Sequence, residues 1–420
     1  MKIGMQTWGS DGDILPFFAL ANGLRAAGHD VTICYTSVDA TDYSALANTI
    51  NIKSINVVPA ITNDIRTVGR EITHTPSVFK QCLLVSSKCF EPALAEMYEA
   101  SQQLCRNHDI VIGHFIQHTL HTAAEKYHIP RVSVCYLPPA IPSRYYPPLG
   151  APDLGSLLNS VQHVLAETIG ARLIFPSLNK LQSREGLSSV KRYAKQITVS
   201  KYLTLVPVSP SLFPRIPDWD HSIQGCGFFN VPISESVWTV PPRLLEFVRT
   251  GTPPIYATFG SMDYYQPESN LRLLIDAITL SKQRAIIQTT INRASISIDN
   301  PNVFIVNKVP YHSVFSLCSA VVHHGGVGTI QASLLAGVPS VVVEHVFDQT
   351  FWAQQLRTIG VTGNVLHRRS VTPQKLADAI HAIISSPKYN ENAKTLGAMM
   401  KKENGVQTAV QLIEETFPMR

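Results

Sequence analysis

The chain has 420 residues and carries 35 Lys and Arg against 30 Asp and Glu, a formal net charge of +5. This slight basic excess argues against a dedicated nucleic-acid binder, whose basic residues would gather in a stripe or a tail. Charged residues make up 15% and hydrophobic residues 45% of the chain, a balance that excludes a largely disordered protein.

The length predicts two domains, with three as the alternative, at roughly 150 residues per domain. We expect neither a membrane span nor a signal peptide, because no run of about 18 uncharged apolar residues occurs and Gly and Asp interrupt the start of the chain. Seven scattered cysteines without a CxxC pair favour reduced thiols and a cytoplasmic location.

The start of the chain follows a strand–helix–strand pattern. Residues 3–7 and 31–35 are short apolar segments, and residues 14–27 between them carry apolar side chains at helical spacing after a glycine-containing turn at 8–13. Such a unit predicts a parallel, doubly wound α/β sheet. Further strands of this sheet are expected at 109–113 and 130–134.

Prolines mark the middle of the chain. Six of them interrupt residues 137–160, and others run from 207 to 217 and on through Pro232, Pro241 and Pro242. This composition is typical of loops and linkers and predicts a domain boundary within 225–250. We therefore expect a first domain at residues 1–225 and a second at 226–400.

The second half repeats the alternation of strands and helices, which predicts a second nucleotide-binding-like domain. Trp8-Gly9-Ser10 and Phe259-Gly260-Ser261 fall at equivalent points of the two halves, a weak internal repeat. Strands are expected at 254–259, 285–288, 303–306, 320–322 and 339–343, and a helix at 270–281.

Three glycines within four residues follow His323 and His324, between an apolar strand and an apolar helix. Glycines let a ligand approach the backbone, and the start of a helix offers unpaired N–H groups to an anion. The segment therefore favours diphosphate binding, with a tight structural turn as the alternative. Zinc is disfavoured because neighbouring residues of a strand point to opposite faces.

Two acidic positions are further candidates. Asp348 and Gln349 follow a strand, where they could hold the hydroxyls of a sugar, or Asp348 could cap the next helix. Asp13 lies in the first glycine loop, where open α/β sheets place ligands. It could act as a general base toward a hydroxyl or serve as a helix cap together with Asp11.

Four segments in this order resemble the family 1 glycosyltransferases of the GT-B fold, in the branch of sterol, antibiotic and rhamnolipid-type enzymes. They are Gly-Ser-x-Gly-Asp-x-x-x-Pro at 9–16, Phe-Gly-Ser-Met at 259–262, His-His-Gly-Gly-x-Gly-Thr at 323–329 and Asp-Gln-x-Phe-Trp-Ala at 348–353. The resemblance spans nearly the whole chain. It implies two Rossmann-like domains facing across a cleft, with a C-terminal helix at 401–420 that packs back on the first.

The resemblance implies that Asp13 is the catalytic base and that no metal is needed. Val309 is expected to flank the nucleobase through its backbone, His324 to meet the diphosphate, and Asp348 and Gln349 to hold the donor sugar. The full set of implied donor contacts is Ser10, Gly12, Ser261, Val309, His324, Gly326, Gly328, Thr329, Asp348 and Gln349.

The predicted reaction is an inverting transfer of a sugar, with glucose favoured, from a nucleotide diphosphate sugar, with UDP favoured, to an apolar acceptor such as a sterol, lipid or polyketide. The nucleotide sugar is a co-substrate, and no cofactor is expected. Two departures from the family leave UDP and dTDP both open: Ala332 replaces a ribose-binding glutamate, and Glu344 replaces a proline.

The acceptor site is predicted from the first half. His114, His118 and His121 have the spacing of one helix face, which suits acceptor-pocket lining or ordinary packing better than a metal. Tyr145 and Tyr146 are candidates for the acceptor wall, with surface cover as the alternative. The charge is compatible with weak peripheral membrane contact, although no basic amphipathic helix stands out.

Two other functions share these features. One is a nucleotide-sugar epimerase of the same fold, against which the Asp-Gln pair and the first glycine loop argue. The other is a non-catalytic protein that binds sugar nucleotides or lipids, which retention of Asp13, His324, Asp348 and Gln349 together argues against. The sequence leaves the oligomeric state undetermined.

Overall fold

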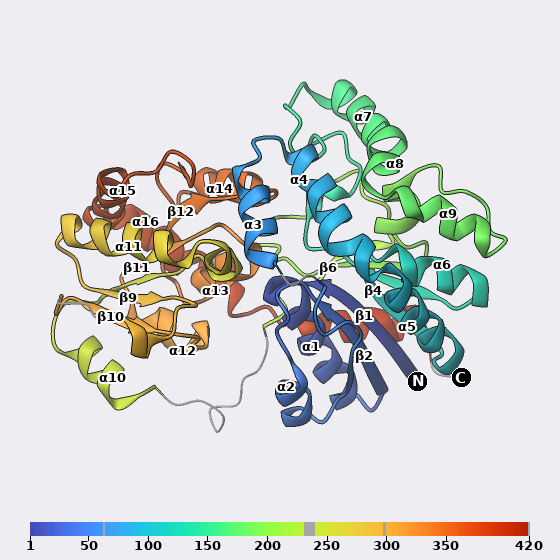
Figure 1. Ribbon diagram of the computed structural model, residues 1–420, viewed down its shortest axis with the longest axis horizontal. Coiled ribbons are helices and arrows are strands. Elements are labelled where there is room, and N and C mark those ends of the chain that lie inside the picture. The colour runs from blue at the N-terminus through green and yellow to red at the C-terminus, as the bar shows by residue number, and fades with distance from the viewer. Residues whose placement is uncertain (62–63, 231–239, 297–299, 419–420) are drawn as a thin grey trace. The chain divides into compact units, whose positions relative to one another are not determined.

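The computed structural model describes residues 1–61, 64–230, 240–296 and 300–418 (Figure 1). The chain forms two compact units, one of Met1–Val68, Thr75–Val231 and Asn404–Arg420 and the other of Gly69–His74 and Pro232–Glu403. Pro232, expected in the linker, lies outside the described residues. No described helix has the length and apolar character needed to cross a bilayer, and none of the seven cysteines forms a disulfide.

The described residues of the first unit form a seven-stranded parallel sheet in the order β3-β2-β1-β4-β5-β6-β7. Strand β1 is buried from its second residue to its last, as is typical of a parallel strand covered on both faces. The strands are β1 (Lys2–Gly9), β2 (Asp30–Ser37), β3 (Lys53–Asn56), β4 (Ile110–His114), β5 (Arg131–Val134), β6 (Leu203–Val206) and β7 (Ile223–Gly225).

Helices cover this sheet, and the C-terminal helix α17 packs on α1, where a Cβ on Gly23 would lie 2.3 Å from Val406. The expected helix at 14–27 begins earlier, at Asp11, so Asp13 lies in its first turn and not in a loop. The helices of this unit are α1 (Asp11–Ala26), α2 (Ser44–Thr49), α4 (Val78–Val85), α5 (Leu94–Asn107), α6 (His118–Tyr127), α7 (Ser156–Leu165), α8 (Ala171–Ile174), α9 (Pro176–Arg184) and α17 (Gly405–Thr416), and α3 (Ile65–His74) is divided between the units.

The described residues of the second unit form a six-stranded parallel sheet in the order β10-β9-β8-β11-β12-β13. Its six positions repeat the order of the first six strands of the first sheet, with β8 in the place of β1 and β11 in the place of β4. The strands are β8 (Ile255–Ala257), β9 (Ala285–Gln288), β10 (Val303–Val306), β11 (Ala320–His323), β12 (Ser340–Glu344) and β13 (Leu366–His367).

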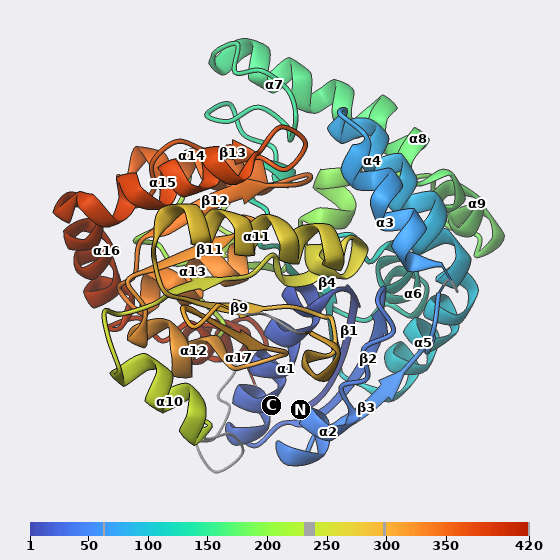
Figure 2. The same cartoon turned by 60° about the vertical axis from the view of Figure 1, so that its left-hand side comes forward.

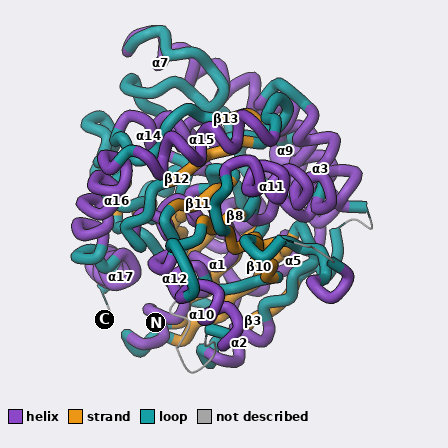
Figure 3. Tube along the Cα trace, turned by 90° about the vertical axis from the view of Figure 1, so that its left-hand side faces the viewer, coloured by secondary structure: helices purple, strands orange, loops and turns teal. Residues whose placement is uncertain are grey.

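Alternate residues of these strands face two separate cores. Ile255 and Ala257 pack toward α11 and α15, whereas Tyr256 packs toward α10 and α12. Helices therefore cover both faces of the sheet (Figures 2 and 3), and the predicted doubly wound α/β class is confirmed for both units. The helices are α10 (Pro242–Arg249), α11 (Pro267–Ser281), α12 (Tyr311–Val314), α13 (Val327–Leu335), α14 (Gln349–Thr358), α15 (Pro373–Ser385) and α16 (Pro387–Met400).

Candidate active site

In the first unit, Asp13 lies at the start of α1, directly after the central strand β1. Ser10 precedes the helix, and its backbone N–H donates to Asp13 Oδ2 at 2.8 Å. The carboxylate thus helps to close a capping box whose N-cap residue is Ser10, a capping role shared with Ser10 and not, as the capping alternative had it, with Asp11. Its side chain is 31% exposed, so the carboxylate remains partly accessible from outside.

Gly9 makes this arrangement sterically feasible. Its φ of +139° lies in a region that favours glycine, and a Cβ at this position would lie 2.2 Å from Asp13 Oδ2. Any side chain at residue 9 would therefore displace the carboxylate. A Cβ on Gly12, in contrast, would lie no closer than 4.0 Å to the Ser10 hydroxyl.

His114 lies beside the second oxygen of Asp13. It lies at the end of β4 with 2% of its side chain exposed, and its Nε2 is 3.4 Å from Asp13 Oδ1 without the alignment of a hydrogen bond. The Ile116 N–H points to Nδ1 at 3.4 Å, which favours the tautomer with its proton on Nε2, toward the carboxylate. Tyr136 supports the same turn, because its hydroxyl donates to the backbone oxygen of Asp13 at 3.0 Å.

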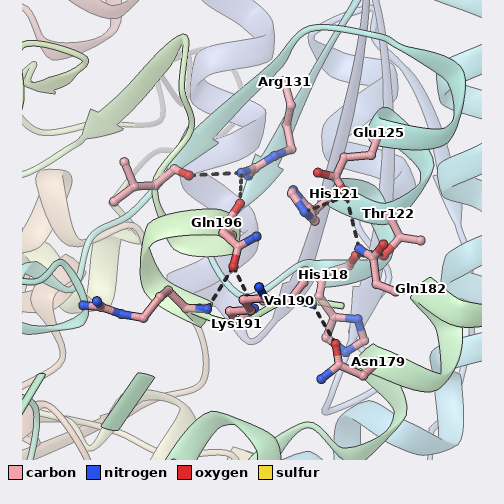
Figure 4. A network of polar contacts seen from close by, with 12 residues as sticks. His118, His121, Thr122, Glu125, Arg131, Asn179, Gln182, Val190, Lys191 and Gln196 are labelled. Atoms are coloured by element: carbon pink, nitrogen blue, oxygen red, sulfur yellow. Dashed lines mark hydrogen bonds and ion pairs between the residues drawn. The ribbon is translucent and has the colours of Figure 1, made fainter. Parts of the chain in front are cut away.

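The expectation that three histidines share one helix face is wrong. His114 belongs to strand β4, and α6 begins only at His118. The structure thereby separates His114, which lies beside Asp13, from His118 and His121, which lie in a buried polar network (Figure 4).

His118 is enclosed between the rings of Phe90 and Phe175, with centroid distances of 4.9 and 5.5 Å. Burial lowers its pKa to about 3, with a smaller contribution from His121, so its imidazole is neutral at pH 7. His121 contacts Glu125 at 3.2 Å. These contacts account for both histidines by packing, and their role toward an acceptor stays a prediction.

Tyr145 and Tyr146 occupy different surroundings. Tyr145 is 47% exposed and lies under the Arg144 guanidinium, 5.7 Å from its ring centroid. Tyr146 is half-buried against Phe213, at a centroid distance of 5.4 Å. Both remain candidates for the acceptor wall.

In the second unit, the ring of His324 lies between two glycines. A Cβ on Gly260 would lie 2.6 Å from Cε1 of this ring, and a Cβ on Gly326 would lie 2.4 Å from its Nε2. Gly326 is the N-cap of α13, whose first turn holds no acidic residue. The imidazole therefore lies beside a helix N-terminus that no described side chain of that turn neutralises, a setting that suits an anion.

Burial keeps this histidine group neutral. It lowers the pKa of His324 to about 4 and that of His323 to about 3, and it places the pKa of His345 well below its ordinary value. His323 Nδ1 accepts from the Gly325 N–H at 3.0 Å, which closes the turn. At pH 7, His324 can therefore offer one N–H to a bound oxygen without a charge of its own.

The Asp348–Gln349 pair begins α14. Asp348 occupies the cap position, but its side chain makes no hydrogen bond to the first turn, so the capping alternative for this residue does not hold. Gln349 is 4% exposed, and its Oε1 accepts from the N–H groups of His345 and Val346 at 2.7 and 3.1 Å. The carboxamide is thus fixed by its oxygen, which leaves its NH2 group to serve as a donor.

The remaining predicted donor contacts lie on the same edge of this sheet, after its strands. Ser261 lies in the short helix at Gly260–Tyr265 that follows β8, and Thr329 is buried in α13. Gly328 also lies in α13, where a Cβ would meet no atom within 4 Å. Val309 is buried, and its N–H points to Gln288 Oε1 at 3.5 Å.

The two departures from the family have local explanations. Ala332 is partly buried and packs against the core that contains Tyr256, and its methyl side chain has no group that could hydrogen-bond a ribose. The buried Glu344 carboxylate contacts His367 of the neighbouring strand β13, whose side chain is largely exposed. Among the described residues, no three His, Cys, Asp or Glu side chains are grouped to hold a metal ion.

Sequence reasoning missed Gly9, His114 as the neighbour of Asp13, Tyr136 and His345. A usable signal existed for three of them, because His114, Tyr136 and His345 each lie within two residues of the end of a predicted strand, at the sheet edge where ligands bind in this class of fold. No sequence pattern indicates which of these side chains turns toward Asp13.

Residues 273–415 match the family model of the erythromycin biosynthesis protein CIII-like C-terminal domain. UDP-sugar-dependent glycosyltransferase 52 of Dictyostelium discoideum is 26% identical over 100% of this chain and 26% of its own length. Sterol 3-beta-glucosyltransferase of Komagataella phaffii is 26% identical over 98% of this chain and 34% of its own length. The chain thus spans only a quarter to a third of these relatives.

Two solved structures share the fold over 99% of this chain and 99% of their own. The glycotransferase of kitacinnamycin has a TM-score of 0.72 and is 18% identical. The Streptomyces glycosyltransferase SsfS6 in complex with thymidine diphosphate has a TM-score of 0.63 and is 17% identical. At such identities the likeness establishes the fold alone.

Proposed function

Because the chain is related to the family 1 glycosyltransferases of the GT-B fold, we propose that it transfers a sugar from a nucleotide diphosphate sugar to a hydroxyl of an apolar acceptor. The donor we propose is UDP-glucose, and the acceptor class is a sterol, a lipid or a polyketide. The transfer is inverting and uses no metal.

The observation that carries this proposal is the place of His324. A neutral, buried imidazole lies against Gly326 at the start of α13, where the first turn supplies N–H groups and no acid. This combination suits the developing charge of a diphosphate leaving group, since fixed donors stabilise charge best where water is excluded.

Asp13 supplies the other half of the proposed chemistry. The acceptor oxygen attacks the anomeric carbon, the bond from that carbon to the diphosphate oxygen breaks, and the hydroxyl proton passes to Asp13 Oδ1. Ser10 fixes the other carboxylate oxygen, so Oδ1 keeps a defined orientation. A positioned base of this kind contributes roughly 10² to 10⁴ in rate.

The choice of UDP and glucose rests on the names of two relatives and on the orientation of Gln349. Two relatives carry UDP-sugar or glucosyl activity in their names, whereas SsfS6 was crystallised with thymidine diphosphate. In this chain Gln349 offers an NH2 group held by its carboxamide oxygen, a donor suited to a sugar hydroxyl. Products from UDP-glucose, UDP-galactose and dTDP-rhamnose with an acceptor library, read by mass spectrometry, decide among them.

Asp13→Asn tests the mechanism directly. The variant keeps an oxygen for the Ser10 N–H, so we expect UDP affinity within about twofold of the native protein and a turnover lowered by roughly 10² to 10⁴. Asp11→Asn in the same helical turn is the control, because Asp11 contacts the Tyr43 hydroxyl instead. Undiminished turnover in Asp13→Asn would remove Asp13 as the base.

Two other outcomes would replace the proposal. A new epimer formed from nucleotide sugar without acceptor would indicate an epimerase. Donor binding without transfer or hydrolysis across the whole acceptor library would indicate a non-catalytic binding protein.

A further inference from the structure

The segment α7–α8 is attached to the first unit by its polar side. α7, the π turn at Ala166–Gly170 and α8 follow one another without a break. Asn159, His163 and Glu167 are spaced four residues apart, and all three are buried. His163 Nε2 contacts the Tyr146 backbone oxygen at 2.9 Å, and Glu167 accepts from Arg192 at 2.7 and 3.1 Å.

The opposite side of the same segment is apolar and exposed. Its side chains are offset by two residues from the buried polar series, which turns them by about 200° around the helix. Leu157 is 84% exposed, and the others are between 52% and 58% exposed: Val161, Leu165, Ile169 and Leu173. The amphipathic pattern is therefore inverted relative to an ordinary surface helix.

The apolar side is also broad. Leu158 and Val164 are 52% and 41% exposed as well. Around a helix, the arc from Val164 through Leu158 to Ile169 covers roughly 140°. The series from residue 157 to 173 extends about 24 Å at 1.5 Å per residue. A narrow seam with alternating spacings of three and four would suit a partner helix, whereas a wide, continuous face suits a planar apolar phase.

Helix α4 extends this surface and adds positive charge. It packs on α8 (Figures 1 and 2), with Phe79 exposed to 40% and close to Gly170. Residues 78–90 and 156–174 hold three exposed basic residues, Lys80, Lys88 and Arg172, and a single acid, Glu167, which is buried against Arg192. The exposed charges of these two segments are thus all positive.

We propose that this α4–α8 face, defined by the exposed residues of 78–90 and 156–174, docks on a membrane surface that contains anionic lipid. The aliphatic side chains enter the boundary between headgroups and acyl chains, and Lys80, Lys88 and Arg172 contact the headgroups. The inference goes beyond the proposed function, because docking needs neither donor nor acceptor and can be measured without turnover.

The test is co-sedimentation of the full chain with vesicles of phosphatidylcholine plus phosphatidylserine, compared with phosphatidylcholine alone. We expect binding to the anionic vesicles that weakens with salt. Leu157→Glu combined with Val161→Glu should lower it at least about tenfold, since each buried aliphatic side chain contributes strongly. Leu280→Glu combined with Met399→Glu is the matched control, because both residues are 50% exposed in the second unit.

A second pair of substitutions addresses charge without touching the apolar face. Lys80→Glu combined with Arg172→Glu should lower binding to anionic vesicles by about fivefold or more per residue and leave thermal stability unchanged.

Three results would overturn the proposal. They are no binding of the native chain to anionic vesicles, equal binding by the aliphatic and control variants, and a native dimer in light scattering that Leu157→Glu with Val161→Glu converts to a monomer. The last result would identify a second copy of the chain as the partner of this face. None of these readouts depends on sugar transfer.

Discussion

Gly326→Ala probes the histidine that the proposed donor site depends on. A Cβ at this position would lie 2.4 Å from His324 Nε2, closer than real contacts allow. The backbone φ of Gly326 is −68°, so alanine adopts it without strain and the clash with the ring is the only direct effect. Gly260 restricts movement of the imidazole further, because it lies close to the neighbouring ring atom Cε1.

The size of the effect follows from the contact that is lost. A hydrogen bond to a charged group contributes about 1.5 to 3 kcal/mol, which corresponds to roughly 10- to 150-fold in affinity. Crowding in a packed site costs about 1 to 3 kcal/mol of folding free energy in addition. We therefore expect UDP to bind roughly 10- to 150-fold more weakly, with a lowered melting temperature.

Calorimetric titration with UDP measures this affinity independently of the chemical step. Gly363→Ala is the matched control, because a Cβ there meets only ordinary contacts at 3.7 and 3.8 Å. If Gly326→Ala binds UDP as tightly as this control, His324 does not contact the diphosphate and the reasoning from the two glycines fails.

Two further predictions concern the histidines of the first unit. His114→Phe keeps the aromatic packing against Tyr136 but removes the N–H beside Asp13. Steady-state kinetics should therefore show kcat lowered about tenfold, with UDP affinity unchanged. An unaltered kcat would show that His114 takes no part in the reaction. The pKa of His118 falls from 6.5 to about 3 on folding. Between about pH 3 and 6.5 the unfolded chain therefore binds one more proton than the folded protein, so the free energy of unfolding decreases as pH falls below about 6.5. Between about pH 7.5 and 5.5, the free energy of unfolding of His118→Leu, measured with denaturant, should fall by about 1.4 kcal/mol less than that of the native protein. An equal fall in the two proteins would contradict a neutral His118.

The fold was largely predictable because both sheets are built from short apolar strands between recognisable helices. Strands β9 and β10 coincide with the expected 285–288 and 303–306. The helix after β1 was expected too late, since Ser10 and Asp13 form a cap that starts it at Asp11. Capping depends on a side-chain geometry that apolar periodicity does not reveal.

The site was predictable where glycine patterns mark it and not where a side chain reaches it from another strand. His324 and Gly326 follow from their motif, but the pairing of His114 with Asp13 depends on β4 lying beside β1, and the sequence alone does not indicate that adjacency.

The α4–α8 face was missed for a related reason. Its basic residues Lys80 and Lys88 come from a segment about eighty residues before its leucines, so neither segment alone reads as a basic amphipathic helix.

The equivalence of the two sheets explains why the first unit supplies the proposed base whereas the second binds the proposed donor: one helix N-terminus carries its own carboxylate and the other is left for the anion of the diphosphate. In each unit the glycine–serine turn follows the strand at which the order of connections reverses, β1 or β8. A histidine stands at the end of the adjacent strand in each unit: His114 is the last residue of β4, and His324 directly follows β11. Open α/β sheets bind ligands at this switch point. The first unit places its own carboxylate, Asp13, in the first turn of α1, so the helix N-terminus there already has an anion. The first turn of α13 has no acid, and the same geometry can therefore accept the anion of a donor diphosphate.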